Sequence, residues 1–392
     1  MNAPIEAAVL LQQGLPQHLP TLIVEATESV AGSPVAVYVF DVDGSILHLL
    51  AGDAELFPER IRAPLAIGPE LPLESLPALG QVLADVLPGS GWAPLLLGNR
   101  ALGALISLSR PAVDLSGPAE QAALALELGS GYTDVVDATR RRRQTQAAAE
   151  IQQNLLPPRL ARVEGADIAG GVLPGYDVGG DFFDYAQNAD GLWLTIADAV
   201  GKGNQAAALA SLAIGALRAA RCAGATLEET AQMMHDSIND LALNFAYVTA
   251  VLAVWHAPTR CLRWLTCGHP RPLVLDPHGD VVELPGAVVP PLGLLEDGRS
   301  MRAAEQILPP GARLVLYSDG ISERRLDGAG ELFGREGIIR TLRACRHSTA
   351  AGTTRALQDA VLGASSESLR DDATLVVLAL DAEESDASSY TG

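Results

Sequence analysis

The sequence predicts an α+β protein with two domains, and three observations lead to that class. The chain has 392 residues, which suits about two domains, and hydrophobic residues make up 48% of it. Its mean hydropathy of +0.20 indicates that both domains can bury a core. In both halves of the chain, segments with helical apolar spacing accompany short apolar strands joined by turn signals.

The first half opens with a helix followed by a hairpin. Apolar residues recur at helical spacing over residues 7–26. Residues 34–40 and 46–50 then read as two strands, and the turn 41–44 between them ends in Asp-Gly.

The turn after the first strand also allows another interpretation. Asp41 and Asp43, followed by glycine, look like the loop of haloacid-dehalogenase-type phosphatases, in which the first Asp is a nucleophile and the second a general acid. That fold needs a later Lys or Arg and further acids on successive βα units, whereas the first half has no lysine and no βα alternation. A hairpin turn is therefore favoured, and a phosphatase using Asp41 is the disfavoured alternative.

A proline-rich loop leads to the rest of the first half. A helix is predicted over residues 76–86, and a second hairpin over 93–108. This order of elements resembles a GAF sensor domain, which we place at residues 1–115. The resemblance implies an α/β sensor with an unidentified small ligand or protein as its partner.

Residues 116–156 predict a helical linker between the halves. Proline and glutamate stand in its first turn, and Leu156-Pro157 stops it. Its apolar seam contains Leu124, Leu128, Tyr132 and Val135, and then, after a polar interruption, Ala148, Ile151 and Leu155. A helix with such a seam suits a coiled-coil-like pair, so we expect a homodimer.

Composition limits the partners and the compartment. A formal net charge of −20 disfavours binding to nucleic acid or to anionic membranes, because phosphate contacts need clustered cations. The four arginines at 140–143 read as a solvated helix face. No stretch approaches the roughly 20 apolar residues of a membrane span, and the chain starts without the basic segment of a signal peptide. We expect a cytoplasmic protein.

The second half places acidic residues at the ends of predicted strands. Residues 192–197 form a short apolar strand that leads into Asp198, and Asp181 follows a glycine pair ahead of the hairpin turn at 188–191. The two carboxylates should face each other across the hairpin. At an effective dielectric near 20, unit charges about 4 Å apart repel by roughly 4 kcal/mol, so the pair needs a cation, a shared proton or solvation. A hard divalent cation suits such oxygen ligands.

Two further strands deliver acids in the same way. Residues 311–317 lead to Asp319-Gly320, and Asp371-Asp372 precede a strand at 375–378. Four acidic positions, Asp181, Asp198, Asp319 and Asp371, therefore lie at strand ends in one continuous half of the chain.

The second half contains eight short motifs in an order that is specific to one family. They are Gln153-Asn-Leu-Leu-Pro157, Gly179-Gly-Asp-Phe-Phe-Asp184, Asp198-Ala-Val-Gly-Lys-Gly203, Tyr247-Val-Thr-Ala250, Cys267-Gly-His-Pro270, Pro291-Leu-Gly293, Tyr317-Ser-Asp-Gly-Ile-Ser-Glu323 and Asp371-Asp-Ala-Thr374. This half resembles the SpoIIE-type (RsbU-like) branch of the PPM (protein phosphatase 2C-like) family of metal-dependent serine/threonine phosphatases. We place the PPM domain at 157–380 and an acidic, disordered tail at 381–392.

The resemblance implies an α/β/β/α sandwich with two Mn²⁺ or Mg²⁺ ions. Carried over to this chain, Asp198 bridges the two metals and the Ala199 carbonyl contributes a ligand. Asp319 and Asp371 complete the shell of one metal, while Asp181 holds the second metal or its waters. Oxygen ligands and retained waters are what hard cations prefer.

The same resemblance fixes the remaining expectations. Asp184 and Asp372 support the ligands, whereas His269, before a proline in a turn, is expected to be structural. The eukaryotic members carry a histidine in the acidic loop as leaving-group acid, but residues 198–203 have none, so a metal-bound water and Lys202 both stay open as the proton donor.

The substrate implied by the family branch is a phosphoserine on an anti-sigma-factor antagonist type of protein. The alternative is a catalytically inactive docking module. Four acidic ligand positions argue against that alternative, because a site kept only for binding has no need to crowd carboxylates.

Overall fold

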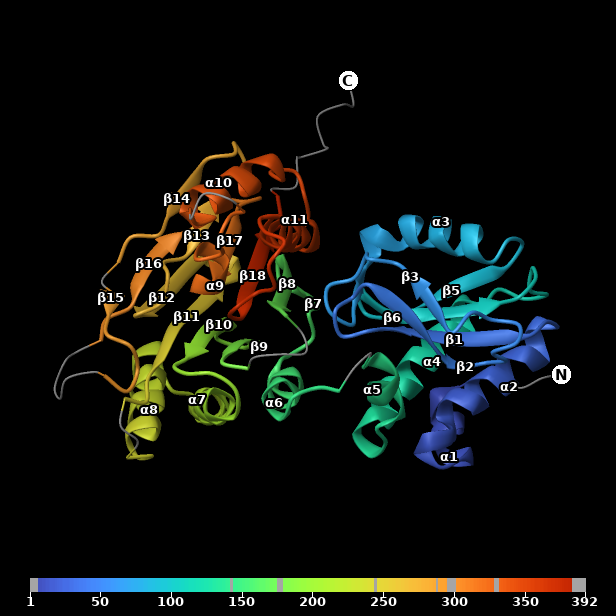
Figure 1. The fold of residues 1–392 in the computed structure, drawn as a ribbon. Coiled ribbons are helices and arrows are strands. Elements are labelled where there is room, and N and C mark those ends of the chain that lie inside the picture. Colours follow the sequence, from blue (N-terminus) through green and yellow to red (C-terminus); the bar gives the residue numbers. More distant parts are fainter. Residues whose placement is uncertain are drawn as a thin grey trace, which may run out of the picture. The chain divides into compact units, whose positions relative to one another are not determined.

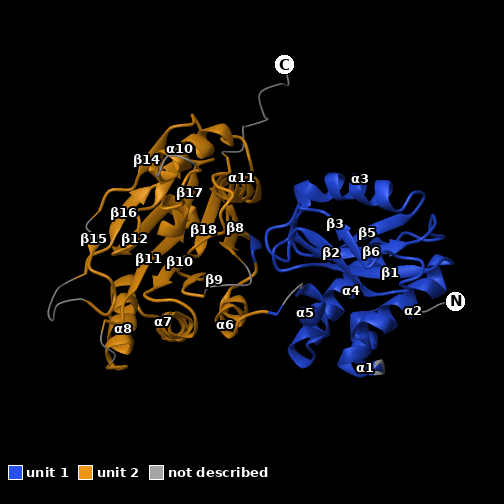
Figure 2. Cartoon of the chain, in the orientation of Figure 1, with its two compact units in different colours: residues 1–144, 159–161 blue, residues 145–158, 162–392 orange. Residues whose placement is uncertain are grey.

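The computed structural model describes residues 6–141, 144–174, 179–242, 245–286, 288–294, 301–327 and 331–382. It divides the chain into two compact units (Figure 2). Unit 1 comprises residues 1–144 and 159–161, and unit 2 comprises residues 145–158 and 162–392. Each unit has its own sheets and its own core.

Unit 1 is built on one six-stranded sheet in the order β3-β2-β1-β6-β4, with β5 also paired to β6. Its strands are β1 (Val35–Phe40), β2 (Ile46–Ala51), β3 (Arg60–Arg62), β4 (Leu71–Pro72), β5 (Gly91–Leu97) and β6 (Arg100–Ser107). Both predicted hairpins, β1–β2 and β5–β6, are present and antiparallel.

Helices cover both faces of this sheet (Figure 1). They are α1 (Ala7–Gln13), α2 (Leu19–Ala31), α3 (Leu76–Val86), α4 (Ser116–Gly129) and α5 (Val135–Arg140), with 3₁₀ turns at η1 (Pro16–His18), η2 (Leu73–Ser75) and η3 (Ser130–Tyr132). Alternate residues of β1 serve opposite faces: Val37 packs with α2 and α4, and Tyr38 packs with α3. This arrangement is compatible with a GAF-like domain.

Asp41 lies in the turn of the first hairpin. Its Oδ1 accepts hydrogen bonds from the backbone N–H groups of Ser45 at 2.8 Å and Ile46 at 3.1 Å. The carboxylate therefore holds an antiparallel turn, and the sheet lacks the parallel βα units that a haloacid-dehalogenase site requires. The interpretation of Asp41 as a phosphatase nucleophile is wrong.

The segment predicted as a helical linker, 116–156, forms separate helices and not one continuous helix. After α4 the chain passes through η3, and Thr133 is extended, with φ −155° and ψ 144°. Helix α6 (Ala147–Leu155) begins only after α5 has ended. The alanine-rich face of α4 is buried in the core of unit 1, whereas the predicted seam residues Leu124 and Leu128 are exposed.

Unit 2 contains two six-stranded sheets. The first has the order β15-β12-β11-β10-β9 with β16 on β12, and its strands are β9 (Asp181–Asn188), β10 (Gly191–Ala199), β11 (Val248–His256), β12 (Cys261–Cys267), β15 (Val288–Val289) and β16 (Ala304–Ile307). The second has the order β14-β13-β17-β18-β8-β7, and its strands are β7 (Leu160–Val163), β8 (Ala166–Leu173), β13 (Leu273–Leu275), β14 (Val281–Glu283), β17 (Arg313–Tyr317) and β18 (Ala373–Leu380).

The two sheets pack face to face and carry helices on their outer sides (Figure 1). These helices are α7 (Asn204–Cys222) and α8 (Leu227–Asn239) on the first sheet, and α10 (Gly334–Ala344) and α11 (Ala350–Gly363) on the second. Short α9 (Asp319–Ser322) follows β17, and the 3₁₀ turn η4 (Ala257–Thr259) connects β11 to β12. Leu194 and Val376 meet in the core between the sheets, while Trp193 packs toward α7 and α8. The predicted α/β/β/α sandwich is confirmed.

In the described part of the chain, no helix combines the length and the apolar character needed to cross a bilayer. All four cysteines are free. Most of the predicted acidic tail, residues 383–392, lies outside the described residues.

Candidate metal centre

The first pair of acids is placed by the β9–β10 hairpin. Asn188 pairs with Gly191 across the turn, and the register then brings Asp181 directly opposite Asp198. Residues directly opposite in an antiparallel pair project to the same face. That face is the inner one, because Phe183 and Ile196, two residues away on each strand, lie in the core between the sheets.

Two glycines allow β9 to start where it does. A Cβ at Gly180 would lie 2.9 Å from the Ala199 carbonyl oxygen, and a Cβ at Gly179 would lie 2.9 Å from backbone atoms of Ala148 in α6. Real Cβ atoms do not approach backbone atoms this closely. The close approach predicted for the glycine pair is present, and it sets Asp181 against the end of β10.

The second pair of acids comes from the ends of β17 and β18. The Ser318 N–H donates to the Thr374 carbonyl at 2.9 Å, and the Thr374 N–H donates to Ser318 Oγ at 3.0 Å. A Cβ at Gly320 would lie only 1.8 Å from the Asp372 carbonyl oxygen, so no other residue fits at this position. This contact holds Asp319, the first residue of α9, beside Asp371.

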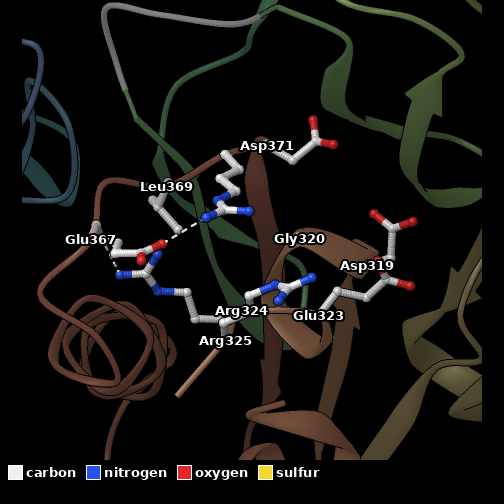
Figure 3. A pocket seen from close by; sticks show the side chains of 9 residues that line it. Asp319, Gly320, Glu323, Arg324, Arg325, Glu367, Leu369 and Asp371 are labelled. Atoms are coloured by element: carbon white, nitrogen blue, oxygen red, sulfur yellow. Dashed lines mark hydrogen bonds and ion pairs between the residues drawn. The ribbon is translucent and has the colours of Figure 1, made fainter. Parts of the chain in front are cut away.

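Asp319 and Asp371 line one cavity of about 190 Å³. Figure 3 shows their carboxylates on one side of this cavity and Glu367 on the other. Both side chains are solvent-accessible, unlike Asp181 and Asp372, which are buried. The centre therefore has a buried part and an open part.

Asp372 ties the two sheets together at this point. Its Oδ2 accepts hydrogen bonds from the backbone N–H groups of Gly180 at 3.1 Å and Asp181 at 3.2 Å, and from the side chain of Gln152 at 2.8 Å. The second sheet thereby holds the first residue of β9 in place.

Burial and neighbouring charges raise the pKa values of Asp181, Asp198 and Asp372. Burial raises the pKa of Asp181 well above its usual range, and the charges of Asp198 and Asp372 add to the effect. Burial, followed by the charge of Asp319, raises the pKa of Asp198 to about 7. Burial raises the pKa of Asp372 to about 6, although its hydrogen bonds act in the opposite direction. Ionising these acids in the folded protein therefore costs free energy unless a bound cation neutralises their charge.

The residues present fit a hard cation. Asp181 Oδ2 and Asp372 Oδ1 are buried and have no hydrogen-bond partner. Carboxylate oxygens are the ligands that Mg²⁺ and Mn²⁺ prefer. Within the described ranges, however, no three His, Cys, Asp or Glu side chains are close enough together to hold a metal ion.

Asp184 does not support the ligands, contrary to expectation. Its carboxylate is buried and binds Arg218 at 2.8 Å and Arg221 at 2.9 Å, both from α7. The reason is the period of two in a strand, because Asp184 shares the helix-facing side of β9 with Phe182, opposite to Asp181. Asp184 anchors α7 to the sheet.

His269 and Lys202 take different places at the centre. His269 is buried with Nδ1 paired to Thr249 Oγ1 at 2.8 Å, and burial lowers its pKa to about 3, so it is a neutral structural residue. Lys202 Nζ donates to the Arg370 carbonyl at 2.8 Å and lies 3.4 Å from Asp371 Oδ2. The lysine thus lies against the open part of the centre.

Sequence reasoning missed Gln152. Hydrophobicity selects Ile151 for the buried seam of its helix, yet Ile151 is 38% exposed and Gln152 only 2% exposed. Spacing alone did not single out Gln152, because Ile151 and Gln152 lie three and four residues after the buried Ala148 and both fall on its side of the helix.

Comparison with known proteins agrees with the fold and with the motifs. Residues 188–381 match the family model for stage II sporulation protein E (SpoIIE). The chain is 23% identical over 238 residues to the phosphoserine phosphatase RsbU of Bacillus subtilis, covering 60% of this chain and 69% of RsbU. The solved SiaA-PP2C domain of Pseudomonas aeruginosa superposes with a TM-score of 0.52 at 24% identity, covering 60% of this chain and 94% of that domain. Unit 2 therefore has the PP2C fold.

The raised pKa values predict a pH-dependent stability for the metal-free protein. An unfolded Asp titrates near about 3.9, so between about pH 4 and pH 7 the folded chain binds more protons than the unfolded chain. The stability that this protonation provides is lost as the pH rises through about 6 and 7, where Asp372 and Asp198 ionise. With chelator present, the melting temperature should fall by several degrees from about pH 5 to about pH 8.

Asp198→Asn provides the control for that experiment. The neutral amide removes one of the repelling charges, so the variant should melt higher than the wild type at about pH 8 and show a flatter pH profile. Identical profiles for the two proteins would contradict the crowding of charge described here.

Proposed function

We propose that the domain matched by the SpoIIE family model, residues 188–381, is a metal-dependent phosphoserine/phosphothreonine protein phosphatase of the PPM family. The observation that carries the proposal is the facing pair Asp181 and Asp198, set against Asp319, Asp371 and Asp372 by the packing of two sheets. A PP2C fold alone permits inactive relatives, whereas this crowding costs stability and is useful only to a cation-binding site.

In this proposal Asp181, Asp198, Asp319, Asp371 and the Ala199 carbonyl would hold two Mn²⁺ or Mg²⁺ ions. Asp319 and Asp371 would serve one ion, Asp181 would serve the other or its waters, and Asp198 with the Ala199 carbonyl would serve both. When bound, such ions activate water and neutralise charge on the phosphoryl group.

The protein's own groups set the geometry for that chemistry. Asp372 holds the backbone of Gly180 and Asp181, and Gly320 allows Asp319 to approach the start of β18. Lys202 is one of several cations near Asp371, since Arg324 and Arg370 line the same cavity as Asp371, and it can orient a phosphoryl oxygen or supply a proton. Phosphoryl transfer depends mostly on such positioning and charge.

We further propose a phosphoprotein substrate of the anti-sigma-factor antagonist type in cytoplasmic bacterial signalling. The similarity to RsbU, named as a phosphoserine phosphatase, supports this class. The open part of the centre also supports it, because the side chains of Lys202 and Asp371 are 63% and 56% exposed. A phosphoserine on a protein surface can reach such a site, whereas a small metabolite would find little enclosure there.

Unit 1 is proposed to be the sensor of a homodimer. Residues 1–115 would form a GAF-like domain for an unidentified ligand or protein, residues 116–156 the helical connection, and residues 157–380 the phosphatase. Three seam residues support self-association, since Leu124, Leu128 and Tyr132 are 38%, 53% and 81% exposed at successive turns. Such a contiguous apolar stripe is typical of an interaction surface.

Removal of a ligand carboxylate tests the catalytic proposal. Asp198→Asn and Asp319→Asn should each reduce Mn²⁺-dependent hydrolysis of p-nitrophenyl phosphate by at least about 100-fold, because a two-metal site loses both charge and a ligand. Asp236→Asn, which changes an exposed acid on α8, should retain wild-type activity. Full activity of either ligand variant would overturn the assignment.

The dimer can be tested by placing a charge on the stripe. Leu128→Arg should convert the protein from dimer to monomer in light scattering, because burying an unpaired arginine costs several kcal/mol. Leu362→Arg, at a leucine of similar exposure (49%) on α11, is the matched control and should stay dimeric. A monomeric wild type would remove the dimer from the proposal.

A further inference from the structure

One buried amide connects α6 to the candidate metal centre. Gln152 is 2% exposed, and its Nε2 donates hydrogen bonds to the Asp181 carbonyl oxygen at 2.7 Å and to Asp372 Oδ2 at 2.8 Å. The first partner lies on β9 of the first sheet and the second lies just before β18 of the second sheet. A single side chain thus spans the two strand ends that supply the buried acids.

The direction of this amide is fixed by its partners. A backbone carbonyl only accepts hydrogen bonds, and Asp372 Oδ2 already accepts two backbone N–H groups. The nitrogen of Gln152 must therefore face both groups. Its Oε1 then points away from them and is buried without a partner.

The helix that carries Gln152 is held firmly at this place. A Cβ at Gly179 would collide with the backbone of Ala148, so α6 lies directly against the start of β9. At the other end, Arg218 of α7 donates to the Leu155 carbonyl at 2.7 Å. The amide therefore acts from a fixed support, which is what a group that positions a ligand requires.

Loss of this amide would affect Asp181 and Asp372, which each have one carboxylate oxygen without a hydrogen-bond partner. Asp372 Oδ2 accepts three hydrogen bonds, whereas Asp372 Oδ1 has no partner. The hydrogen bond from Gln152 to the Asp181 carbonyl holds the backbone of Asp181, whose Oδ2 also has no partner. Without the amide, the Asp372 carboxylate could turn, and β9 could shift at its first residue. Asp181 Oδ2 and Asp372 Oδ1 would then no longer be held in their present positions.

We propose that Gln152 is a positioning residue for the metal centre, which holds Asp181 and Asp372 in the arrangement that binds a divalent cation. This inference rests on the proposed function, since it concerns the same centre. Groups that orient metal-binding carboxylates typically change metal affinity or activity by about 10–100-fold when they are removed. Gln152 touches neither substrate nor the reacting atoms.

The test compares two isosteric substitutions on one helix in the full-length protein. Gln152→Met keeps the length and burial of the side chain but removes the donor, and Asn154→Leu makes the same kind of change at an exposed amide bonded only to Glu150. Mn²⁺ affinity is measured by calorimetry, activity is measured across a Mn²⁺ titration, and the melting temperature is measured in chelator.

Gln152→Met should weaken Mn²⁺ binding by about 10–100-fold and shift the activation curve to higher Mn²⁺ by the same factor, with most of kcat regained at saturation. Asn154→Leu should leave both measurements within about twofold. If Gln152→Met fails to fold, Gln152→Asn, whose amide is one methylene too short for both bonds, carries the same expectation.

Unchanged Mn²⁺ affinity in Gln152→Met, with or without a lower melting temperature, would overturn the positioning role and leave the proposed function intact. A wild-type protein that neither binds Mn²⁺ nor hydrolyses phosphoserine would instead overturn the proposed function, and the positioning role with it.

Discussion

Mutual repulsion between carboxylates is the constraint around which the C-terminal unit is arranged. The inner faces of two packed sheets bring Asp181 and Asp198 together with acids from the ends of β17 and β18. Unit charges about 4 Å apart repel by roughly 4 kcal/mol at an effective dielectric near 20. Raised carboxyl pKa values are the visible result of that repulsion. A fold that brings these groups together must be held by contacts that do not depend on them.

Those contacts are apolar packing and close backbone approach. The core between the sheets and the core under α7 and α8 fix the strands on both sides of the centre. Gly180 and Gly320 have no Cβ atom. A Cβ there would lie 2.9 Å and 1.8 Å, respectively, from a backbone oxygen and would force the strand ends apart. Asp372 and Gln152 complete the arrangement, because a carboxylate and an amide hydrogen bond across the junction. The acids are therefore imposed on the site by the rest of the domain.

The predictable part of this site is the part governed by local rules. A turn signal and a period of two were enough to place Asp181 opposite Asp198, and strand ends marked Asp319 and Asp371. Two errors have one cause, because they depend on which surface a side chain meets. Asp184 lies on the helix side of its strand, and Gln152 is buried where Ile151 was expected. Periodicity in a sequence shows which residues share a face of a helix or strand, but not which element packs against that face.

The most direct test of the account is phosphate release from a phosphoserine protein by the full-length wild-type chain, measured in Mn²⁺ and in chelator. Release should be rapid in Mn²⁺, abolished in chelator, and restored when Mn²⁺ is added back, because the crowded carboxylates can act only when a cation neutralises their charge. Release that is equally fast in chelator, or absent with Mn²⁺ from a folded protein, would contradict it.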